Sequence, residues 1–290
     1  MSSLIKIAVD AMGGDNSPEK VIKGIIYHSS INRDIFYKIF GDEKKIIELL
    51  ENKINKDNYE IINTLNKVSS EDSPLEAAKR GKDSSMWLAI ESVKNKDCDI
   101  VISAGNTGAL LVISKLNLKM IENIDKPALS ALWPNKKGMS VVLDLGANIE
   151  CSSKNLFDFS VMGASLYKSL YPNEVPNVAL LNIGSEELKG NETIKETFKL
   201  LNHKKNKDFE FSGYIEGNEL MNGNVNVIVS DGFTGNVALK TAEGTANFIM
   251  DELKKALGGT FVGKISSLLN ISNLKKFKKR LDPRLYNGAI

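Results

Sequence analysis

The chain has 290 residues, of which 42% are hydrophobic, a composition that supports a sizeable core and excludes a disordered protein. Its formal net charge is only +2, yet residues 252–290 carry nine Lys or Arg against two acidic residues, so this segment alone suggests an anionic partner. Two cysteines favour a reducing cytosol, and no apolar run approaches the roughly 18 to 20 residues of a membrane span. We therefore expect a cytoplasmic protein that is at most peripherally associated with a membrane, and no nucleic acid partner.

Strands and helices alternate along the first half of the chain. The apolar patterns predict strands at 4–9, 36–40, 59–63 and 99–102. Helix-start signals and apolar spacing predict helices over about 18–29 and 43–53, one long helix over 73–94, and another from Ala109 onward. Each strand is therefore followed by a glycine or polar turn and then by a helix.

The second half continues this alternation. Strands are predicted at 129–133, 139–143, 178–183, 209–215 and 225–229, and helices at about 155–170, from Glu192, and over 236–257. Such alternation indicates a three-layer α/β fold with a mainly parallel sheet covered by helices on both faces. No low-complexity linker interrupts it, so we expect one catalytic domain over 1–257 and a separate amphipathic basic helical segment over 258–290.

Two loops share the pattern S-x-G-x-T-G, and each follows an apolar strand and precedes a helix. Small residues let a ligand approach the backbone, hydroxyl groups form hydrogen bonds, and a helix start supplies N–H groups, which together suit a phosphate or an oxyanion. Two such loops on one sheet edge would form a pocket, although either alone is also an economical strand-to-helix turn. The candidate binding residues are Ser103, Gly105, Asn106, Thr107 and Gly108 in the first loop, and Ser230, Asp231, Gly232, Thr234 and Gly235 in the second.

Residues 180–197 place polar chemistry directly after a buried strand. Here LLNIG ends the apolar run, and Glu186 and Lys189 precede the predicted helix from Glu192. In α/β proteins sites lie at the carboxyl ends of strands, and a helix start favours anions. Solvated charges on an ordinary loop explain the same pattern, so both interpretations stay open at this point.

Several chemistries are disfavoured. The chain lacks G-x-x-x-x-G-K-[ST] and a G-x-G-x-x-G at its first strand, which argues against nucleotide binding. His28 and His203 are its only histidines and neither adjoins a glycine turn, so a Ser-His or Cys-His nucleophile pair and a His-based zinc site are not expected. Cys151 has no basic partner nearby, which favours a structural thiol over a nucleophile. Five acidic residues are predicted at strand ends: Asp10, Asp15, Asp144, Glu150 and Asp231. They could bind Mg²⁺, but orienting hydrogen-bond donors or capping helices is the simpler explanation.

What remains is a site rich in Gly, Asn, Ser and Thr, with one lysine and no evident general base. Such a site suits a nucleophile that needs no deprotonation, as inorganic phosphate is at neutral pH. We expect no cofactor and no metal.

Seven motifs carry a resemblance to a known family. They are DAMGGD (10–15), KDSSM (82–86), SAGNTGAL (103–110), LDLGANIEC (143–151), LLNIGSEELKGNE (180–192), YIEGNEL (214–220) and SDGFTGNVALK (230–240). In this order they resemble the phosphate acyltransferase (PlsX) family of bacterial phospholipid synthesis. The resemblance implies transfer of a fatty acyl group from acyl carrier protein to inorganic phosphate, which forms acyl phosphate for phosphatidic acid synthesis. It also implies a fold similar to phosphotransacetylase and the isocitrate dehydrogenase-like group, and a homodimer.

The same resemblance assigns roles to individual residues. Lys189 and Asn236 match Lys and Asn positions of the family motifs, so we expect them to be catalytic by stabilising the oxyanion or the departing thiolate. Asn148 and Glu186 join the loop residues in the expected phosphate and thioester site. Two alternatives stay open: a phosphotransacetylase-like enzyme that uses acyl-coenzyme A, and a catalytically impaired, membrane-associated scaffold.

The C-terminal segment has its own predicted role. Gly258-Gly259 breaks the long helix, and apolar residues then recur three and four apart among lysines: Phe261, Ile265, Leu268, Leu274, Phe277 and Leu281. A basic amphipathic helix pair suits a membrane surface or dimer packing. Since a membrane glycerol-3-phosphate acyltransferase would consume the product, we favour the membrane surface; the same basic face suits acidic acyl carrier protein. By the resemblance, the chain stops short of the family's usual C-terminal end.

Overall fold

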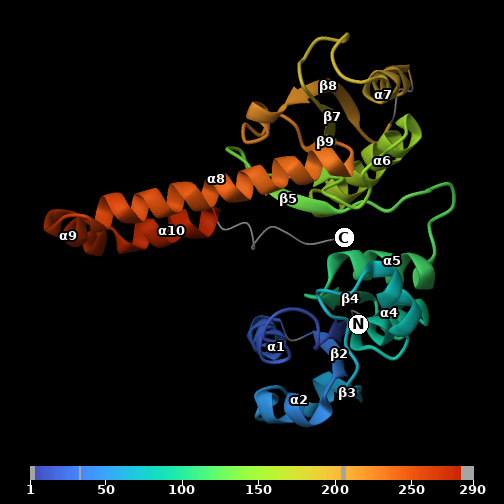
Figure 1. The fold of residues 1–290 in the computed structure, drawn as a ribbon, viewed down its shortest axis with the longest axis vertical. Helices are drawn as coiled ribbons and strands as arrows, with labels where there is room; N and C mark the ends of the chain where they lie inside the picture. The colour runs from blue at the N-terminus through green and yellow to red at the C-terminus, as the bar shows by residue number, and fades with distance from the viewer. Residues whose placement is uncertain (1–3, 33, 204–206, 282–290) are drawn as a thin grey trace. The chain divides into compact units, whose positions relative to one another are not determined.

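The chain folds into two compact units, residues 1–122 and 123–290 (Figure 1). The computed structural model describes residues 4–32, 34–203 and 207–281. The division after Glu122 has no counterpart in the predicted boundaries of 1–257 and 258–290, which stay a prediction.

Unit 1 is built on a parallel sheet of four strands in the order β3-β2-β1-β4. Its strands are β1 (Ile5–Asp10), β2 (Ile35–Gly41), β3 (Tyr59–Asn63) and β4 (Ile100–Ser103). Its α-helices are α1 (Glu19–Ile31), α2 (Glu43–Leu50), α3 (Pro74–Arg80), α4 (Ser85–Lys94) and α5 (Thr107–Leu118), with a 3-10 turn, η1 (Lys56–Asn58).

Alternating side chains of β1 build the core on both faces of this sheet. Ile7 and Val9 pack with Ile22 of α1 and Ile46 of α2, whereas Ala8 packs with Ala89 of α4. The sheet therefore lies between two helical layers, which is the arrangement predicted for parallel strands.

The single long helix predicted over 73–94 is wrong, because the structure has α3 and α4 in its place. The Ser84 hydroxyl donates to the Gly81 carbonyl at 2.6 Å and accepts from the Trp87 N–H at 3.3 Å. Helix α3 ends at Arg80 with Gly81 as its C-cap, and Ser84 is the N-cap of α4, since its side chain accepts a backbone N–H of the first turn. The break places Ser85 at the start of α4, close to the end of β1.

Unit 2 is built on a five-stranded sheet in the order β5-β6-β9-β7-β8, in which only the β5–β6 pairing is antiparallel. Its strands are β5 (Ser130–Pro134), β6 (Met139–Leu143), β7 (Asn177–Asn182), β8 (Glu210–Glu216) and β9 (Val227–Val229). The α/β class with mainly parallel pairing is confirmed, while the strands form two sheets where one was expected.

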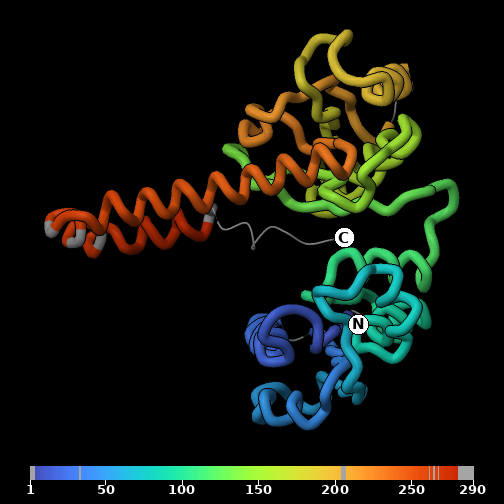
Figure 2. The backbone as a smooth tube through the Cα atoms, viewed as in Figure 1, coloured from blue at the N-terminus to red at the C-terminus, as the bar shows by residue number. Residues whose placement is uncertain are grey.

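Helices cover both faces of this second sheet. Leu156 and Phe159 of α6 (Ser153–Leu170) and Ile194 of α7 (Glu192–His203) pack on one face. Leu239 of α8 (Gly232–Gly258) packs on the other with Ala179. A 3-10 turn, η2 (Gly217–Glu219), follows β8. The path of the chain through these layers can be followed in Figure 2.

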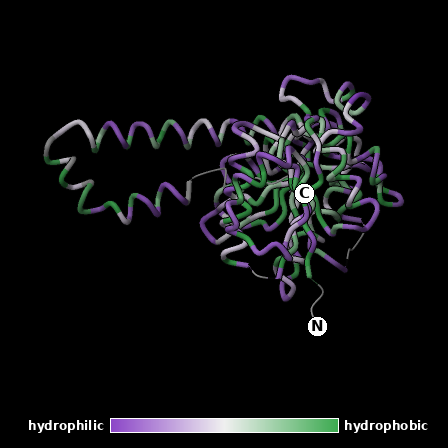
Figure 3. The backbone as a smooth tube through the Cα atoms, turned by 90° about the horizontal axis from the view of Figure 1, so that it is seen from below, coloured by the Kyte–Doolittle hydropathy of each residue, from purple (hydrophilic) through white to green (hydrophobic). Residues whose placement is uncertain are grey.

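The helix α8 continues well past the sheet. At 27 residues it is about 40 Å long, and it ends at Gly258 with Gly259 as C-cap, so the predicted break at these glycines is confirmed. Two shorter helices follow, α9 (Phe261–Leu269) and α10 (Ile271–Leu281), and hydrophobic and hydrophilic segments alternate along them (Figure 3).

Several apolar side chains of this helical segment are exposed, among them Val262, Leu268 and Phe277. The predicted contributions of Phe261, Lys264, Arg280, Leu281 and Arg284 lie outside the described side chains. Within the described part of the chain, no helix combines the length and the apolar character that crossing a membrane requires.

Candidate functional site

Three neighbouring parallel strands of unit 2, β6, β9 and β7, end at the same edge of the sheet. Their carboxyl ends lead into residues 144–148, 230–235 and 183–191, respectively. In parallel α/β sheets this edge is where ligands bind. The structure therefore brings one S-x-G-x-T-G loop and the Lys189 segment to a common edge.

The loop at 230–235 forms the start of α8. Asp231 is the N-cap: its carboxylate accepts from the Thr234 N–H at 2.8 Å and from the Thr234 hydroxyl at 2.9 Å. This cap explains why α8 begins at Gly232, earlier than the predicted 236. Ser230 is buried, and its hydroxyl donates to the Asp144 carbonyl at 3.3 Å.

Glycine is required where α8 starts, because the backbone of residues 144–148 lies directly against it. A Cβ on Gly232 would lie 2.5 Å from the Asn148 carbonyl oxygen, and one on Gly235 would lie 1.9 Å from the Asp144 carbonyl oxygen. No side chain fits at such distances from a backbone atom. Gly232 and Gly235 thus allow the start of α8 to pack closely against the 144–148 loop.

The loop at 144–148 turns around the buried carboxylate of Asp144. That carboxylate accepts hydrogen bonds from the N–H groups of Gly146, Ala147 and Asn148 at 3.1, 2.9 and 2.8 Å. Asn148 Nδ2 donates to Asp144 at 2.8 Å and to the Pro127 carbonyl at 2.7 Å. The side-chain amide of Asn148 is thus engaged in holding the loop, and its expected contact with substrate stays a prediction.

The side chain of Asn182, the last residue of β7, holds together the two ends of the segment 183–191. Asn182 Nδ2 donates to the carbonyls of Gly184 at 3.1 Å and Lys189 at 3.2 Å. The Lys189 N–H donates to the Glu186 carbonyl at 2.9 Å, and both side chains are exposed. The Lys189 side chain is exposed, so an anionic ligand can reach its ammonium group.

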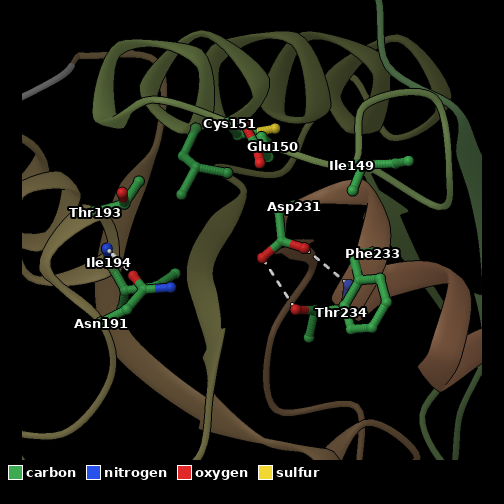
Figure 4. Close-up of a pocket in the computed structure, with 10 residues that line it drawn as sticks. Ile149, Glu150, Cys151, Asn191, Thr193, Ile194, Asp231, Phe233 and Thr234 are labelled. Carbon is green, nitrogen blue, oxygen red and sulfur yellow. Dashed lines mark hydrogen bonds between the residues drawn. The ribbon is translucent and has the colours of Figure 1, made fainter.

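A pocket of about 450 Å³ lies between the starts of α7 and α8. Figure 4 shows Asn191, Thr193 and Ile194 on one side of it and Asp231, Phe233 and Thr234 on the other. Ile149, Glu150, Cys151 and Leu156 complete its lining. Of these residues only Asp231 and Thr234 were predicted for the site. Asn191 was detectable as the N-cap of α7, whose Oδ1 accepts from the Ile194 N–H at 2.9 Å.

The other S-x-G-x-T-G loop lies in unit 1, at the end of β4. The Ser103 hydroxyl donates to Asp10 Oδ2 at 2.6 Å and accepts from the Gly105 N–H at 3.1 Å. Ser85 donates to the other oxygen of the same buried carboxylate at 2.5 Å. No local pattern in the sequence indicates this contact of Ser85, because it depends on the break between α3 and α4.

The rest of this loop starts α5. Asn106 is the N-cap: its Oδ1 accepts from the Ala109 N–H at 3.1 Å, and its Nδ2 donates to the Asp72 carbonyl at 2.9 Å. Thr107 is exposed, and a Cβ on Gly108 would lie 2.8 Å from Pro74. As in α8, a polar cap residue and a closely packed glycine build the helix start.

The expectation that both loops share one sheet edge is wrong, since one belongs to each sheet. The two loops are nevertheless built alike. Asp10 pairs in register with Ser103, and the Asp144 N–H donates to the Ser230 carbonyl at 3.0 Å. In each unit a buried aspartate thus lies at the end of the strand next to the one that carries the loop: Asp10 is the last residue of β1, and Asp144 directly follows β6.

Other predicted chemistry can be located as well. Burial raises the pKa of the Cys151 thiol, although a hydrogen bond from the Gly232 backbone opposes the shift, so the thiolate is disfavoured. His28 Nδ1 lies 2.7 Å from the Tyr37 hydroxyl in unit 1. No group of three or more His, Cys, Asp or Glu side chains in the described ranges is arranged to hold a metal ion.

Comparison with solved structures places this fold among the phosphotransacetylases. A EutD phosphotransacetylase from Staphylococcus aureus superposes with a TM-score of 0.61 over 84% of this chain and 82% of its own, at 16% identity. A phosphotransacetylase from Streptococcus pyogenes also gives 0.61, at 17% identity over 84% of this chain and 83% of its own. Identities this low establish the fold alone.

Sequence comparison establishes the family. Residues 5–290 match the family described as "Fatty acid synthesis protein". A phosphate acyltransferase of Pelagibacter ubique is 75% identical over all of this chain and 87% of its own length, and one of Maricaulis maris is 42% identical over all of this chain and 84% of its own. The chain belongs to this family of phosphate acyltransferases, as its motifs indicate.

Proposed function

We propose that this enzyme transfers a fatty acyl group from the thioester of acyl carrier protein to inorganic phosphate, and that the acyl phosphate serves phosphatidic acid synthesis. One observation carries the proposal: in a family of phosphate acyltransferases, Lys189 lies in the segment after β7 and Asn236 near the start of α8, which follows the neighbouring strand β9. Phosphate is already an anion, so the reaction needs no general base to activate it.

In the proposed reaction a phosphate oxygen attacks the thioester carbonyl, and the carbon–sulfur bond then breaks to release the carrier thiolate. The Lys189 ammonium group and the Asn236 amide stabilise the charge that develops on the carbonyl oxygen or on the departing sulfur. In unit 2, phosphate is held by the loop residues Ser230, Asp231, Gly232, Thr234 and Gly235, together with Asn148 and Glu186. The loop residues of unit 1, Ser103, Gly105, Asn106, Thr107 and Gly108, form a second candidate phosphate-binding loop.

The decisive experiment is mass-spectrometric detection of acyl phosphate from palmitoyl acyl carrier protein and phosphate. Lys189→Ala and Asn236→Ala are each expected to lower kcat by about 10²- to 10³-fold, the usual effect of removing one preorganised donor. Lys199→Ala, which removes an exposed lysine of α7, is the matched control and is expected to retain full activity. Full acyl phosphate formation by either site variant would refute its assigned role.

A phosphotransacetylase-like reaction with acyl-coenzyme A is the second candidate, because the solved structures of this fold carry that name. Parallel assays with carrier and coenzyme A thioesters of the same acyl chain separate the two. A higher kcat/KM for the coenzyme A thioester would favour this alternative, and no product from either thioester would favour a non-catalytic scaffold.

We also propose that α9 and α10 bind a membrane surface, where a glycerol-3-phosphate acyltransferase would receive the product. Exposed lysines at 275, 276, 278 and 279 alternate with exposed apolar side chains such as Phe277. Anionic vesicles should therefore sediment the protein at low salt, and Phe277→Asp should weaken this sedimentation. Unchanged sedimentation of the variant would contradict the proposal.

The family resemblance further leads us to propose a homodimer. Multi-angle light scattering at micromolar concentration should give twice the chain mass. A monomer mass with full activity would exclude a dimer as the catalytic form.

A further inference from the structure

The carboxylate of Asp144 is the most heavily hydrogen-bonded side chain at the unit 2 sheet edge. The residue is fully buried. Besides its four bonds from residues 146–148, it accepts from the Leu129 N–H at 3.1 Å. These bonds offset the cost of removing a carboxylate from water.

The loop that this carboxylate holds is also the surface on which α8 starts. The Gly232 N–H donates to the Asn148 carbonyl at 2.8 Å, and the Asp144 carbonyl is the atom that a Cβ on Gly235 would strike. Both contacts come from backbone atoms of the loop. The position of the first turn of α8 therefore depends on the conformation that Asp144 imposes.

Gly146 connects this loop with Asn236. Its φ of +132° is one that residues with a side chain rarely adopt, and its N–H is held by Asp144. A Cβ on Gly146 would lie at ordinary contact distance from Asn236, 3.4 Å from its Cγ and 3.6 Å from its Oδ1, so Gly146 faces the side chain of Asn236. Asp144 is thus linked to Asn236 on two sides, through Gly146, which faces the Asn236 side chain, and through Gly235, the residue before Asn236, which packs against the Asp144 carbonyl.

We propose that Asp144 is a positioning residue of the acyl-transfer site, which acts by holding the 144–148 loop as the support for Asn236. The inference rests on the proposed function, in which Asn236 stabilises developing charge. A displacement of about 1 Å at such a group can cost about 10² in rate. Asp144 itself touches no substrate in this account, because its oxygens are occupied by the loop.

Asp144→Asn is the direct test, because it keeps the shape of the side chain and replaces one acceptor oxygen by an NH₂ group. In either orientation that NH₂ group faces at least two N–H groups that formerly donated to the carboxylate. We expect kcat to fall by about 10- to 100-fold with a smaller change in KM, since the supported group acts in the transition state. Asp158→Asn, which alters another buried aspartate of unit 2, is the matched control and should change stability without lowering kcat.

A double-mutant cycle separates positioning from a general structural effect. If Asp144 acts through Asn236, Asp144→Asn should lower kcat by less than about 3-fold in an Asn236→Ala background. A loss there as large as in the wild type would overturn the inference. Wild-type activity of Asn236→Ala alone would instead refute the role assigned to Asn236 in the proposed function.

A measurement that needs no activity completes the test. The side-chain amide NMR signals of Asn236, assigned by their absence in Asn236→Ala, should shift or broaden in Asp144→Asn and stay unchanged in Asp158→Asn. Unchanged signals in Asp144→Asn would overturn the inference whatever the enzyme catalyses. If Asp144→Asn does not fold, Gly146→Ala applies the same NMR and kinetic tests at the intervening residue, and wild-type behaviour of that variant would equally overturn it.

Discussion

Two glycines of the same helix, Gly235 and Gly244, should respond to alanine in opposite directions. A Cβ on Gly235 would lie 1.9 Å from the Asp144 carbonyl oxygen and 2.7 Å from Ser230 Oγ, and the first of these is a backbone atom that cannot rotate away. A Cβ on Gly244 would meet nothing within 4 Å. Gly235→Ala must therefore displace either α8 or the 144–148 loop, whereas Gly244→Ala only adds helix propensity.

The expected magnitudes follow from these distances. Overpacking of this kind costs about 1 to 3 kcal/mol, and a change from glycine to alanine inside a helix stabilises by about 0.5 to 1 kcal/mol. For a unit of this size each kcal/mol moves Tm by about 2 to 4 °C, so Gly235→Ala should melt about 2 to 12 °C lower and Gly244→Ala a few degrees higher. Differential scanning calorimetry measures both.

The same pair of variants tests the link between packing and catalysis. Because Asn236 follows Gly235 directly, Gly235→Ala should also lower the rate of acyl phosphate formation, while Gly244→Ala should not. A Gly235→Ala variant that melts at or above the wild-type temperature would show that the start of α8 is not packed as described. It would also refute the proposal that Asp144 positions Asn236.

Three further predictions concern other parts of the chain. Cys151→Ser should retain full activity, and Cys151, whose pKa is raised by burial, should react with iodoacetamide at pH 8 more slowly than free cysteine but faster than the buried Cys98. Asn106→Ala should lower the free energy of unfolding in urea by about 1 to 3 kcal/mol, because it removes the N-cap of α5 and the donor to the loop carbonyls. A decrease below about 0.5 kcal/mol, which is typical of a neutral surface substitution, would contradict this. Burial raises the pKa of Tyr167, and its 2.6 Å hydrogen bond to Glu174 raises it further. The stability that the protonated Tyr167 contributes is therefore present below about pH 10 and is lost as the pH rises through the pKa of the folded state. Tyr167→Phe should reduce the loss of stability at alkaline pH, and an unchanged loss would contradict this prediction.

The outline of the fold was predictable because it depends on local patterns. Buried strands such as Val178–Leu181 are continuous apolar runs, and helix starts carry cap residues such as Asp231, so both are legible in the sequence. The break at Ser84 was missed because the apolar spacing continues across it. Only the hydrogen bond that Ser84 accepts from the Trp87 N–H distinguishes this cap from an ordinary serine in a helix.

The residues of the site were predictable as motifs, and their division between two units was not. Both S-x-G-x-T-G loops follow a strand and precede a helix, as the sequence predicted, but strand order depends on pairing between distant segments. The roles of Asp10 and Asp144 likewise emerge only when strands far apart in the chain become neighbours. The roles of Lys189 and Asn236 stay predictions that the proposed experiments test.

The sequence by itself determined the family, the α/β class, the loop residues and the basic C-terminal segment, since each of these is carried by residue types at fixed local spacing. Tertiary structure alone decided that the strands form two sheets, that β6, β9 and β7 share an edge, and that the side chain of Asn236 faces a glycine held by Asp144. These features arise from contacts between segments tens of residues apart, for which local spacing carries no signal.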